Sequence, residues 1–203
     1  MILLSSTTSN TCYQNNNKIH KEALMINIKQ MHHVAYRCKD AKATVEWYKH
    51  FLNMDLLVAI SEDIVPSTKE PDPYMHIFLD AGMGNILAFF ELPTQPEMSR
   101  DLNTPKWVQH IAFELDDRDA LVAAKAELEE KGLEVLGITS HGIIYSIYFF
   151  DLNGHRLELT YRSGTDEQLQ QLKDVAPAMI EEWAVTKRAP QHAKWLHEDE
   201  LTK

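Results

Sequence analysis

The sequence predicts an α+β protein made of two similar modules, each with the order strand, helix, strand, strand, strand. Three observations support this prediction. Apolar residues alternate over short segments, an aspartate stands at the start of each expected helix, and the whole order occurs twice. We expect the first module at residues 27–98 and the second at residues 104–163. The two modules should pair into a curved mixed sheet around a metal site.

The first module begins with a strand expected at residues 30–37. Asp40 is expected to cap a helix that runs to Leu52, because an aspartate side chain can accept hydrogen bonds from the first turn. Further strands are expected at 54–60, 74–79 and 86–92. Residues 66–73 contain three prolines and are expected to form a loop.

The second module repeats this order. A strand is expected at 107–115, followed by a helix at 120–131 that starts after Asp116 and Asp117 and ends at Gly132. Further strands are expected at 133–138, 143–150 and 155–161. Asp151-Leu-Asn-Gly154 has the composition of a tight turn before the last strand.

The two ends of the chain differ from the modules. Residues 1–26 are rich in polar low-complexity runs and are expected to be disordered, with Met25 as an alternative start. Residues 164–203 are expected to form a helical extension, in which Pro177 begins a second helix. Its apolar face is predicted to contain Leu169, Leu172, Met179, Ile180 and Trp183. The extension could pack on the core, cover the site or join a second subunit.

Composition narrows the possible functions. The 203 residues carry a net charge of −10, which argues against nucleic acid or an anionic membrane surface as the main partner. No apolar run is long enough to span a bilayer, and the first residues do not have the pattern of a secretory signal. Cys12 and Cys38 have no metal-binding or redox spacing, so we expect a cytoplasmic protein.

Two histidines and a glutamate are the candidate metal ligands. His33 and His110 occupy matching places in His33-Val-Ala-Tyr and His110-Ile-Ala-Phe. Glu158 lies between Leu157 and Leu159, where an unpaired buried charge would cost roughly several kcal/mol. Two histidines and one carboxylate form the ligand set of an open non-haem iron site.

Other polar residues near these strands are assigned ordinary roles. A lone histidine in a strand is more often a core or surface residue than a ligand, and His32 and His76 are assigned to that class. His32 is expected to face away from His33 and to pair with nothing. When the modules are aligned on Gly84 and Gly154, Ala88 matches Glu158, and Glu91 lies three residues further along. Glu91 should therefore face the opposite side, which leaves three ligands and open coordination positions.

With these motifs, residues 28–162 resemble the vicinal oxygen chelate superfamily, which includes glyoxalase I, bleomycin-resistance proteins and extradiol dioxygenases. Residues 139–158, TSHGIIYSIYFFDLNGHRLE, are similar to the extradiol motif of a histidine, an apolar-Tyr pair, an Asp-Pro-x-Gly turn and a ligand glutamate. Leu152 replaces the proline. The resemblance implies that His33, His110 and Glu158 bind Fe(II), with Mn(II), Zn(II) or Ni(II) as alternatives. It also implies that His141 and Tyr148 hydrogen-bond the substrate oxygen or dioxygen.

The function implied by this resemblance is extradiol cleavage of a small catechol-like aromatic substrate by dioxygen, in a homodimer. The sequence departs from the larger extradiol enzymes, which have an additional pair of modules and an acid–base histidine late in the first metal-binding module. Two alternatives remain open. One is a glyoxalase I-like lyase or isomerase, which would need Glu91 at the metal. The other is a non-enzymatic binding protein of the bleomycin-resistance type.

Overall fold

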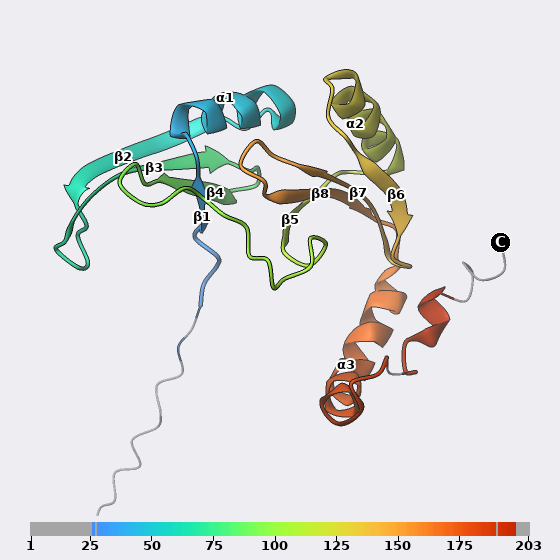
Figure 1. Cartoon of the computed structure of the whole chain (residues 1–203). Helices are drawn as coiled ribbons and strands as arrows, with labels where there is room; N and C mark the ends of the chain where they lie inside the picture. The colour runs from blue at the N-terminus through green and yellow to red at the C-terminus, as the bar shows by residue number, and fades with distance from the viewer. Residues whose placement is uncertain (1–25, 27, 190, 198–203) are drawn as a thin grey trace, which may run out of the picture. The chain divides into compact units, whose positions relative to one another are not determined.

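The computed structural model describes residues 26, 28–189 and 191–197. From His32 onward these residues form one unit that contains two four-stranded sheets (Figure 1). The sheets have the strand orders β1-β4-β3-β2 and β5-β8-β7-β6. In each sheet the first strand of the module runs parallel to the last, and the other neighbours are antiparallel. The predicted α+β fold of two βαβββ modules is therefore confirmed.

The first module follows the expected order with shifted boundaries. Its elements are β1 (Val34–Cys38), α1 (Ala41–Leu52), β2 (Leu56–Ile64), β3 (Pro71–Asp80) and β4 (Ile86–Glu91). The Asp40 side chain caps α1 by accepting a hydrogen bond from the Ala43 N–H at 2.8 Å. The prediction that residues 66–73 form only a loop is wrong, since β3 already begins at Pro71. Pro71 is tolerated there because it is the first residue of the strand.

The second module repeats the pattern. Its elements are β5 (His110–Glu114), α2 (Arg118–Glu130), β6 (Leu136–Ser140), β7 (Ile144–Phe150) and β8 (Arg156–Arg162). Asp117 caps α2 by accepting from the Ala120 N–H. The tight turn between β7 and β8 is closed by a 3.1 Å hydrogen bond from the Gly154 N–H to the Asp151 carbonyl. Gly154 has a φ of 92°, a conformation that favours glycine.

The C-terminal extension differs from the prediction. It contains one long helix, α3 (Asp166–Thr186), and a short 3₁₀ helix, η1 (Lys194–His197). Pro177 lies inside α3 and does not start a second helix. One proline removes only one backbone donor from the helix, and a capping box of Thr165 and Gln168 fixes where α3 begins. α3 contains no buried residue. The expectations for residues 1–25 and for the last six residues lie outside the described part of the chain.

A single apolar core joins the two modules. α1 packs on β3 and β4, and α2 packs on β7 and β8 (Figure 1). The large side chains of the core that are fully buried include Tyr48, Leu79, Phe89, Leu121, Ile147, Phe149 and Leu157. Burial of each such side chain contributes about 1.5–3 kcal/mol. In both sheets, alternate residues of the last strand face the helix, so the intervening residues face the other side.

Buried polar groups also connect the modules. The Tyr48 hydroxyl of α1 donates a hydrogen bond to Asp151 Oδ2 at 3.0 Å, and the Asn153 amide donates to Thr44 Oγ1 at 3.1 Å. Asp151 Oδ1 accepts from the backbone N–H groups of Asn153 and His155. Burial, followed by the charge of Asp151, raises the pKa of Tyr48, so the phenol remains a donor. The turn before β8 is thus anchored to a helix of the other module.

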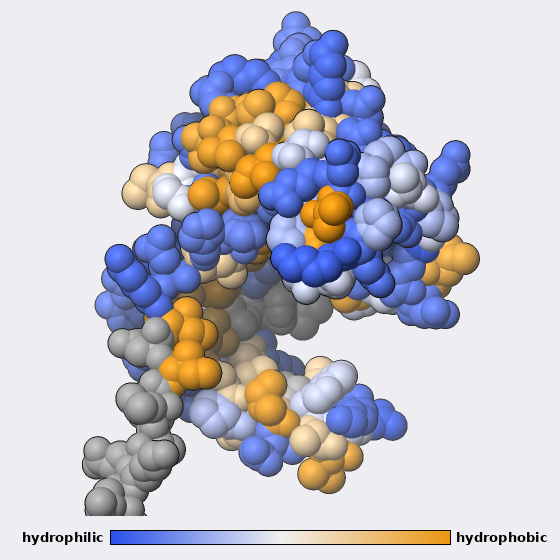
Figure 2. Space-filling view, turned by 90° about the vertical axis from the view of Figure 1, so that its left-hand side faces the viewer, coloured by the Kyte–Doolittle hydropathy of each residue, from blue (hydrophilic) through white to orange (hydrophobic). Residues whose placement is uncertain are grey.

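The edge strands expose apolar side chains. All nine residues of β2 are exposed, including Leu56, Val58 and Ile60, and the β6 residues Leu136 and Ile138 are also exposed. Figure 2 is viewed from the side where the β2–β3 hairpin lies in Figure 1, and it shows hydrophobic residues gathered among hydrophilic ones. Exposed apolar edge strands are typical of surfaces that pair with another chain. Among the described residues, no helix is long and apolar enough to cross a membrane.

The link at Asp151 gives a prediction about stability. We expect Asp151→Ala to lower the free energy of unfolding by about 2–4 kcal/mol, because the Tyr48 hydroxyl and two N–H groups, one buried and one partly buried, lose their acceptor. Urea unfolding followed by circular dichroism would measure the change. Asp116→Ala, at an exposed position, is the control and should change stability by less than about 0.5 kcal/mol. Equal stabilities of the two variants would contradict the proposed role of Asp151.

Candidate functional site

The candidate site lies on the face of the second sheet opposite α2. In β8, Leu157 and Leu159 face the helix and join the core, so Glu158 faces the other side. Strand pairing places Glu158 beside Ala112 of β5 and Tyr148 of β7. Directly opposite residues of neighbouring strands share a face, and Tyr148 and Glu158 are therefore side by side. Only 3% of Glu158 is exposed, so its carboxylate needs a partner.

His110 is one partner of this carboxylate. Its Nε2 lies 2.9 Å from Glu158 Oε2, and its Nδ1 lies 3.0 Å from the Val108 carbonyl oxygen. A carbonyl accepts, so Nδ1 carries the donated hydrogen and the ring is held in one orientation. Histidine ligands of metals are commonly oriented by such a carbonyl contact, with the other nitrogen free to bind. The candidate nitrogen ligand, His110 Nε2, and the candidate oxygen ligand, Glu158 Oε2, thus lie side by side.

Tyr148 continues this series of contacts. Its hydroxyl donates to Glu158 Oε1 at 3.2 Å and lies 2.7 Å from His141 Nε2. The guanidinium carbon of Arg156 lies 3.9 Å from the centre of the Tyr148 ring, a cation–π distance. Burial raises the pKa of Tyr148, as does the charge of Glu158, while Arg156 acts in the opposite direction. Tyr148 is therefore a neutral donor with a charged group on either side.

His33 lies in a different group of residues. It directly precedes β1, its Nδ1 is 2.7 Å from the Nδ1 of His32, and its ring centre is 5.9 Å from that of His76. The expectation that His32 faces away from His33 is wrong, because both residues lie before β1 begins and do not alternate there as strand residues would. Burial lowers the pKa of His76, and the neighbouring His33 adds to this effect.

The predicted ligands therefore fall into two clusters. His110 and Glu158 are in contact, whereas His33 sits with His32 and His76. Across the described residues, no group of three histidine, cysteine or acidic side chains is close enough to hold a metal ion. The three-residue ligand set of His33, His110 and Glu158 is still a prediction. The two histidines nevertheless occupy equivalent places in their modules. His33 lies two residues before Ala35, which pairs with Ala88, and His110 lies two residues before Ala112, which pairs with Glu158.

Glu91 has a separate structural role. The strand pairs Ala35–Ala88 and Ala112–Glu158 agree with the alignment of the modules on their turn glycines. Glu91 lies three residues beyond Ala88 and therefore faces α1, where its Oε2 accepts a 2.7 Å hydrogen bond from the Ala41 N–H. A carboxylate at this helix N-terminus also interacts favourably with the helix dipole.

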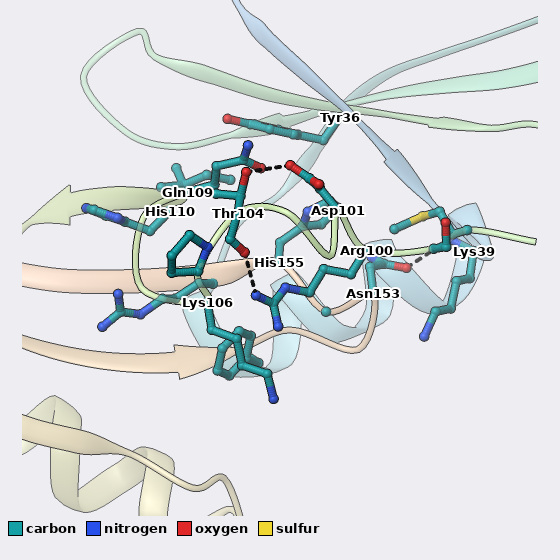
Figure 3. A pocket seen from close by; sticks show the side chains of 17 residues that line it. Tyr36, Lys39, Arg100, Asp101, Thr104, Lys106, Gln109, His110, Asn153 and His155 are labelled. Atoms are coloured by element: carbon teal, nitrogen blue, oxygen red, sulfur yellow. Dashed lines mark hydrogen bonds between the residues drawn. The ribbon is translucent and has the colours of Figure 1, made fainter.

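A pocket of about 360 Å³ adjoins His110 (Figure 3). Residues of β1, the segment 98–109 and the β7–β8 turn surround it, and Tyr36, Arg100 and His155 are among those labelled in the figure. Arg156 also lines the pocket. Sequence reasoning missed Arg156, although it lies two residues before Glu158. That spacing predicts the same face of β8, so the strand period could have identified it.

Among solved structures similar to this chain, one has a TM-score that supports the fold. A glyoxalase family protein from Bacillus cereus is 11% identical, with a TM-score of 0.56 over 70% of this chain and 99% of that protein. A mutant of the fosfomycin resistance protein FosX from Listeria monocytogenes, solved with Mn(II) and 1S,2S-dihydroxypropylphosphonic acid, is 20% identical. Its TM-score is 0.48, covering 71% of this chain and 99% of that protein. Lactoylglutathione lyase from Agrobacterium tumefaciens is 17% identical, with a TM-score of 0.46 and coverages of 66% and 94%.

The sequence comparison identifies the family. No protein of curated function matches the chain. The model of the Glyoxalase/Bleomycin resistance protein/Dioxygenase superfamily matches residues 30–159, which run from β1 into β8 and include all the predicted site residues. The chain therefore belongs to the glyoxalase/bleomycin resistance protein/dioxygenase superfamily.

Proposed function

We propose that this protein is a metal-dependent dioxygenase that cleaves a small catechol-like aromatic substrate in the extradiol manner. The series of contacts from His141 through Tyr148 and Glu158 to His110 carries the proposal. These four residues come from separate strands and one loop, yet their polar atoms are in hydrogen-bonding contact. In this series His141 is the candidate acid–base group and Tyr148 is a neutral donor. The candidate ligands are Glu158 and His110.

Each residue has a role that suits this chemistry. His110 and Glu158 would hold Fe(II), with Mn(II), Zn(II) or Ni(II) as alternatives, since imidazole and carboxylate suit several divalent ions. The ion would lower the pKa of a bound catechol and provide a place for dioxygen. With Glu158 holding the ion, the Tyr148 hydroxyl would donate its single hydrogen to the ionised substrate oxygen in place of Glu158. His141 could give or take a proton during ring opening.

A second copy of the chain is the proposed source of the third ligand. His33 lies with His32 and His76 and not with His110, although both sets occupy equivalent faces of their sheets. The exposed apolar residues of β2 and β6 offer surface for association. We therefore place His33 of one protomer with His110 and Glu158 of the other in a homodimer. A two-fold dimer would contain two such sites.

The two alternative functions differ in measurable ways. A glyoxalase-like isomerase would use Glu91 as a ligand, but the Glu91 carboxylate is occupied by the N-terminus of α1. A metal-free binding protein would need no cation beside Glu158. Elemental analysis of protein purified without chelators separates these cases. A fully folded protein that takes up no Fe, Mn, Zn or Ni would support the binding function and contradict the dioxygenase.

The first functional prediction concerns His141. After anaerobic loading with Fe(II), the protein should cleave a catechol with uptake of dioxygen and formation of a yellow product. We expect His141→Ala to lower kcat by about 10²–10⁴-fold while iron binding is retained, because His141 contacts Tyr148 and neither candidate ligand. Oxygen uptake and absorbance would measure the rate.

Two further variants control this experiment. His50→Ala changes an exposed histidine of α1 and should leave kcat unchanged. Glu158→Gln should abolish iron binding, since a neutral amide replaces the carboxylate ligand. If no member of a catechol panel is cleaved by the iron-loaded protein, the dioxygenase proposal is wrong.

The shared site gives a second prediction. His33→Ala and Glu158→Ala should each be inactive alone. After the two variants are unfolded and refolded together, activity should return to about a quarter of the wild-type value. Half of the random dimers are mixed, and each mixed dimer keeps one complete site of its two. Recovery below a few per cent, with mixed dimers demonstrated by mass spectrometry, would contradict a shared site.

The pKa of Tyr148 gives a third prediction. Because burial and Glu158 raise this pKa above its usual value of 10.0, the folded state holds the proton more strongly than the unfolded chain. The resulting stabilisation is complete below pH 10 and is lost as the pH rises through the raised pKa. The difference in absorbance at 295 nm between wild type and Tyr148→Phe should therefore develop only above pH 10. A difference that titrates below pH 10 would contradict this assignment.

A further inference from the structure

The pocket beside His110 has a charge opposite to that of the whole chain. The chain has a net charge of −10, yet this pocket is lined by four cationic side chains and one acidic one. The cations are Lys39, Arg100, Lys106 and Arg156, and the acid is Asp101. A small concave surface lined by one sign of charge concentrates ions of the other sign. The local excess of positive charge therefore favours an anionic occupant.

Within the described part of the chain, no carboxylate pairs directly with these cations. Among the ion pairs of the described residues, none includes Lys39, Arg100, Lys106 or Arg156. The Asp101 carboxylate accepts hydrogen bonds from the Thr104 hydroxyl, drawn in Figure 3, and from the Asn103 N–H. These two hydrogen bonds lower the pKa of Asp101, and the nearby positive charge of Arg100 lowers it further by a smaller amount. One acid leaves most of the positive charge unbalanced.

The two guanidinium groups are held in place by backbone carbonyls. Arg100 Nη2 donates to the Thr104 carbonyl at 3.0 Å, and Arg156 Nη1 donates to the Trp107 carbonyl at 2.6 Å. Each guanidinium has five N–H donors. Within the described part of the chain, each of the two groups donates only the one hydrogen bond just given. Both arginines are anchored while other donors remain for a ligand. A planar guanidinium fork matches the oxygens of a carboxylate or a phosphate.

The pocket shares His110 with the candidate site. His110 lines the pocket and also contacts Glu158, and Arg156 lines it while lying over the Tyr148 ring. Tyr36, Ile111 and Phe150 add apolar surface to its lining. A volume of about 360 Å³ suits a small molecule. An aromatic ligand could therefore place a negatively charged substituent among the cations while its ring lies beside His110.

We infer that this pocket binds an oxyanion group of a small aromatic ligand, with Arg100 and Arg156 as the principal donors. The inference rests on the proposed function in one respect, because it makes that oxyanion a substituent of the substrate. It names the substrate class as catechols that carry a carboxylate or a phosphonate. The uncharged parent catechol would lack this contact.

Binding can be measured without any metal or turnover. Isothermal titration of the full-length protein at low salt would compare benzoate, phenylphosphonate and uncharged benzyl alcohol. We expect benzoate, phenylphosphonate or both to bind at least about tenfold more tightly than benzyl alcohol, and the preference to weaken as NaCl screens the charges. The comparison of the two anions decides between carboxylate and phosphonate. Equal binding of all three compounds would overturn the inference.

Matched variants locate the bound anion. Arg100→Gln and Arg156→Gln should each weaken binding of the preferred anion about tenfold or more, with no change for benzyl alcohol. Arg118→Gln removes an exposed arginine of α2 outside the pocket and should leave binding unchanged. Arg100 lies in an exposed segment, so its variant tests the pocket even if Arg156→Gln does not fold. Loss of binding in Arg118→Gln as large as in Arg100→Gln would also overturn the inference.

Turnover separates this inference from the proposed function. If the Fe(II)-loaded protein is a dioxygenase, kcat/KM for 3,4-dihydroxybenzoate should exceed that for catechol, and Arg100→Gln should remove most of the difference through KM. Arginine-dependent anion binding without cleavage of either compound would overturn the dioxygenase and leave the anion site intact. Cleavage of both compounds with equal kcat/KM, unaffected by Arg100→Gln, would overturn the anion site and leave the dioxygenase intact.

Discussion

The buried carboxylate of Asp151 is the constraint on which the rest of the structure depends. It lies in the turn that joins β7 to β8, and it binds the Tyr48 hydroxyl of the first module and two backbone N–H groups of its own turn. Because an unpaired charge would be costly there, turn and helix must keep their relative positions. Tyr148 lies on the strand that enters this turn, and Glu158 lies on the strand that leaves it. An interaction that joins the modules therefore also positions the candidate site.

Strand parity explains why two glutamates of similar surroundings have different roles. Glu158 and Glu91 both lie on the last strand of a module, next to apolar residues. Glu91 is displaced by an odd number of residues from the position that matches Glu158, so it faces the helix and binds the first turn of α1. Glu158 faces the other side, where His110 and Tyr148 reach it. The repeat thus places Ala88 in the first module where Glu158 stands in the second. Glu158 is a candidate ligand, whereas Glu91 lies away from this matched position and has a structural role.

Much of the fold could be predicted because its signals are local. Asp40 and Asp117 mark the starts of the helices, and Gly154 marks the last turn. The prediction that a second helix begins at Pro177 was wrong because a long helix can tolerate one missing backbone donor. The resemblance assigned both His141 and Tyr148 to the site, but the hydrogen-bonding contact between them was not predicted. The separation of His33 from His110 depends on how the modules pack, which no local pattern encodes.

Charges of opposite sign around Tyr148 connect the two parts of the proposed site. Glu158 accepts the hydrogen bond of the phenol, and Arg156 lies over its ring, so the two groups act on its pKa in opposite directions. Glu158 favours a neutral phenol, whose single hydrogen could be donated to a substrate oxygen when the carboxylate holds a metal ion. Arg156 would at the same time present its remaining donors to an anionic substituent. A substrate that carries both a catechol oxygen and an oxyanion could satisfy both groups at once, whereas a neutral catechol would leave the cations unpaired. Selectivity between the two would then come from charge balance within the site, with no change needed at the metal-binding residues.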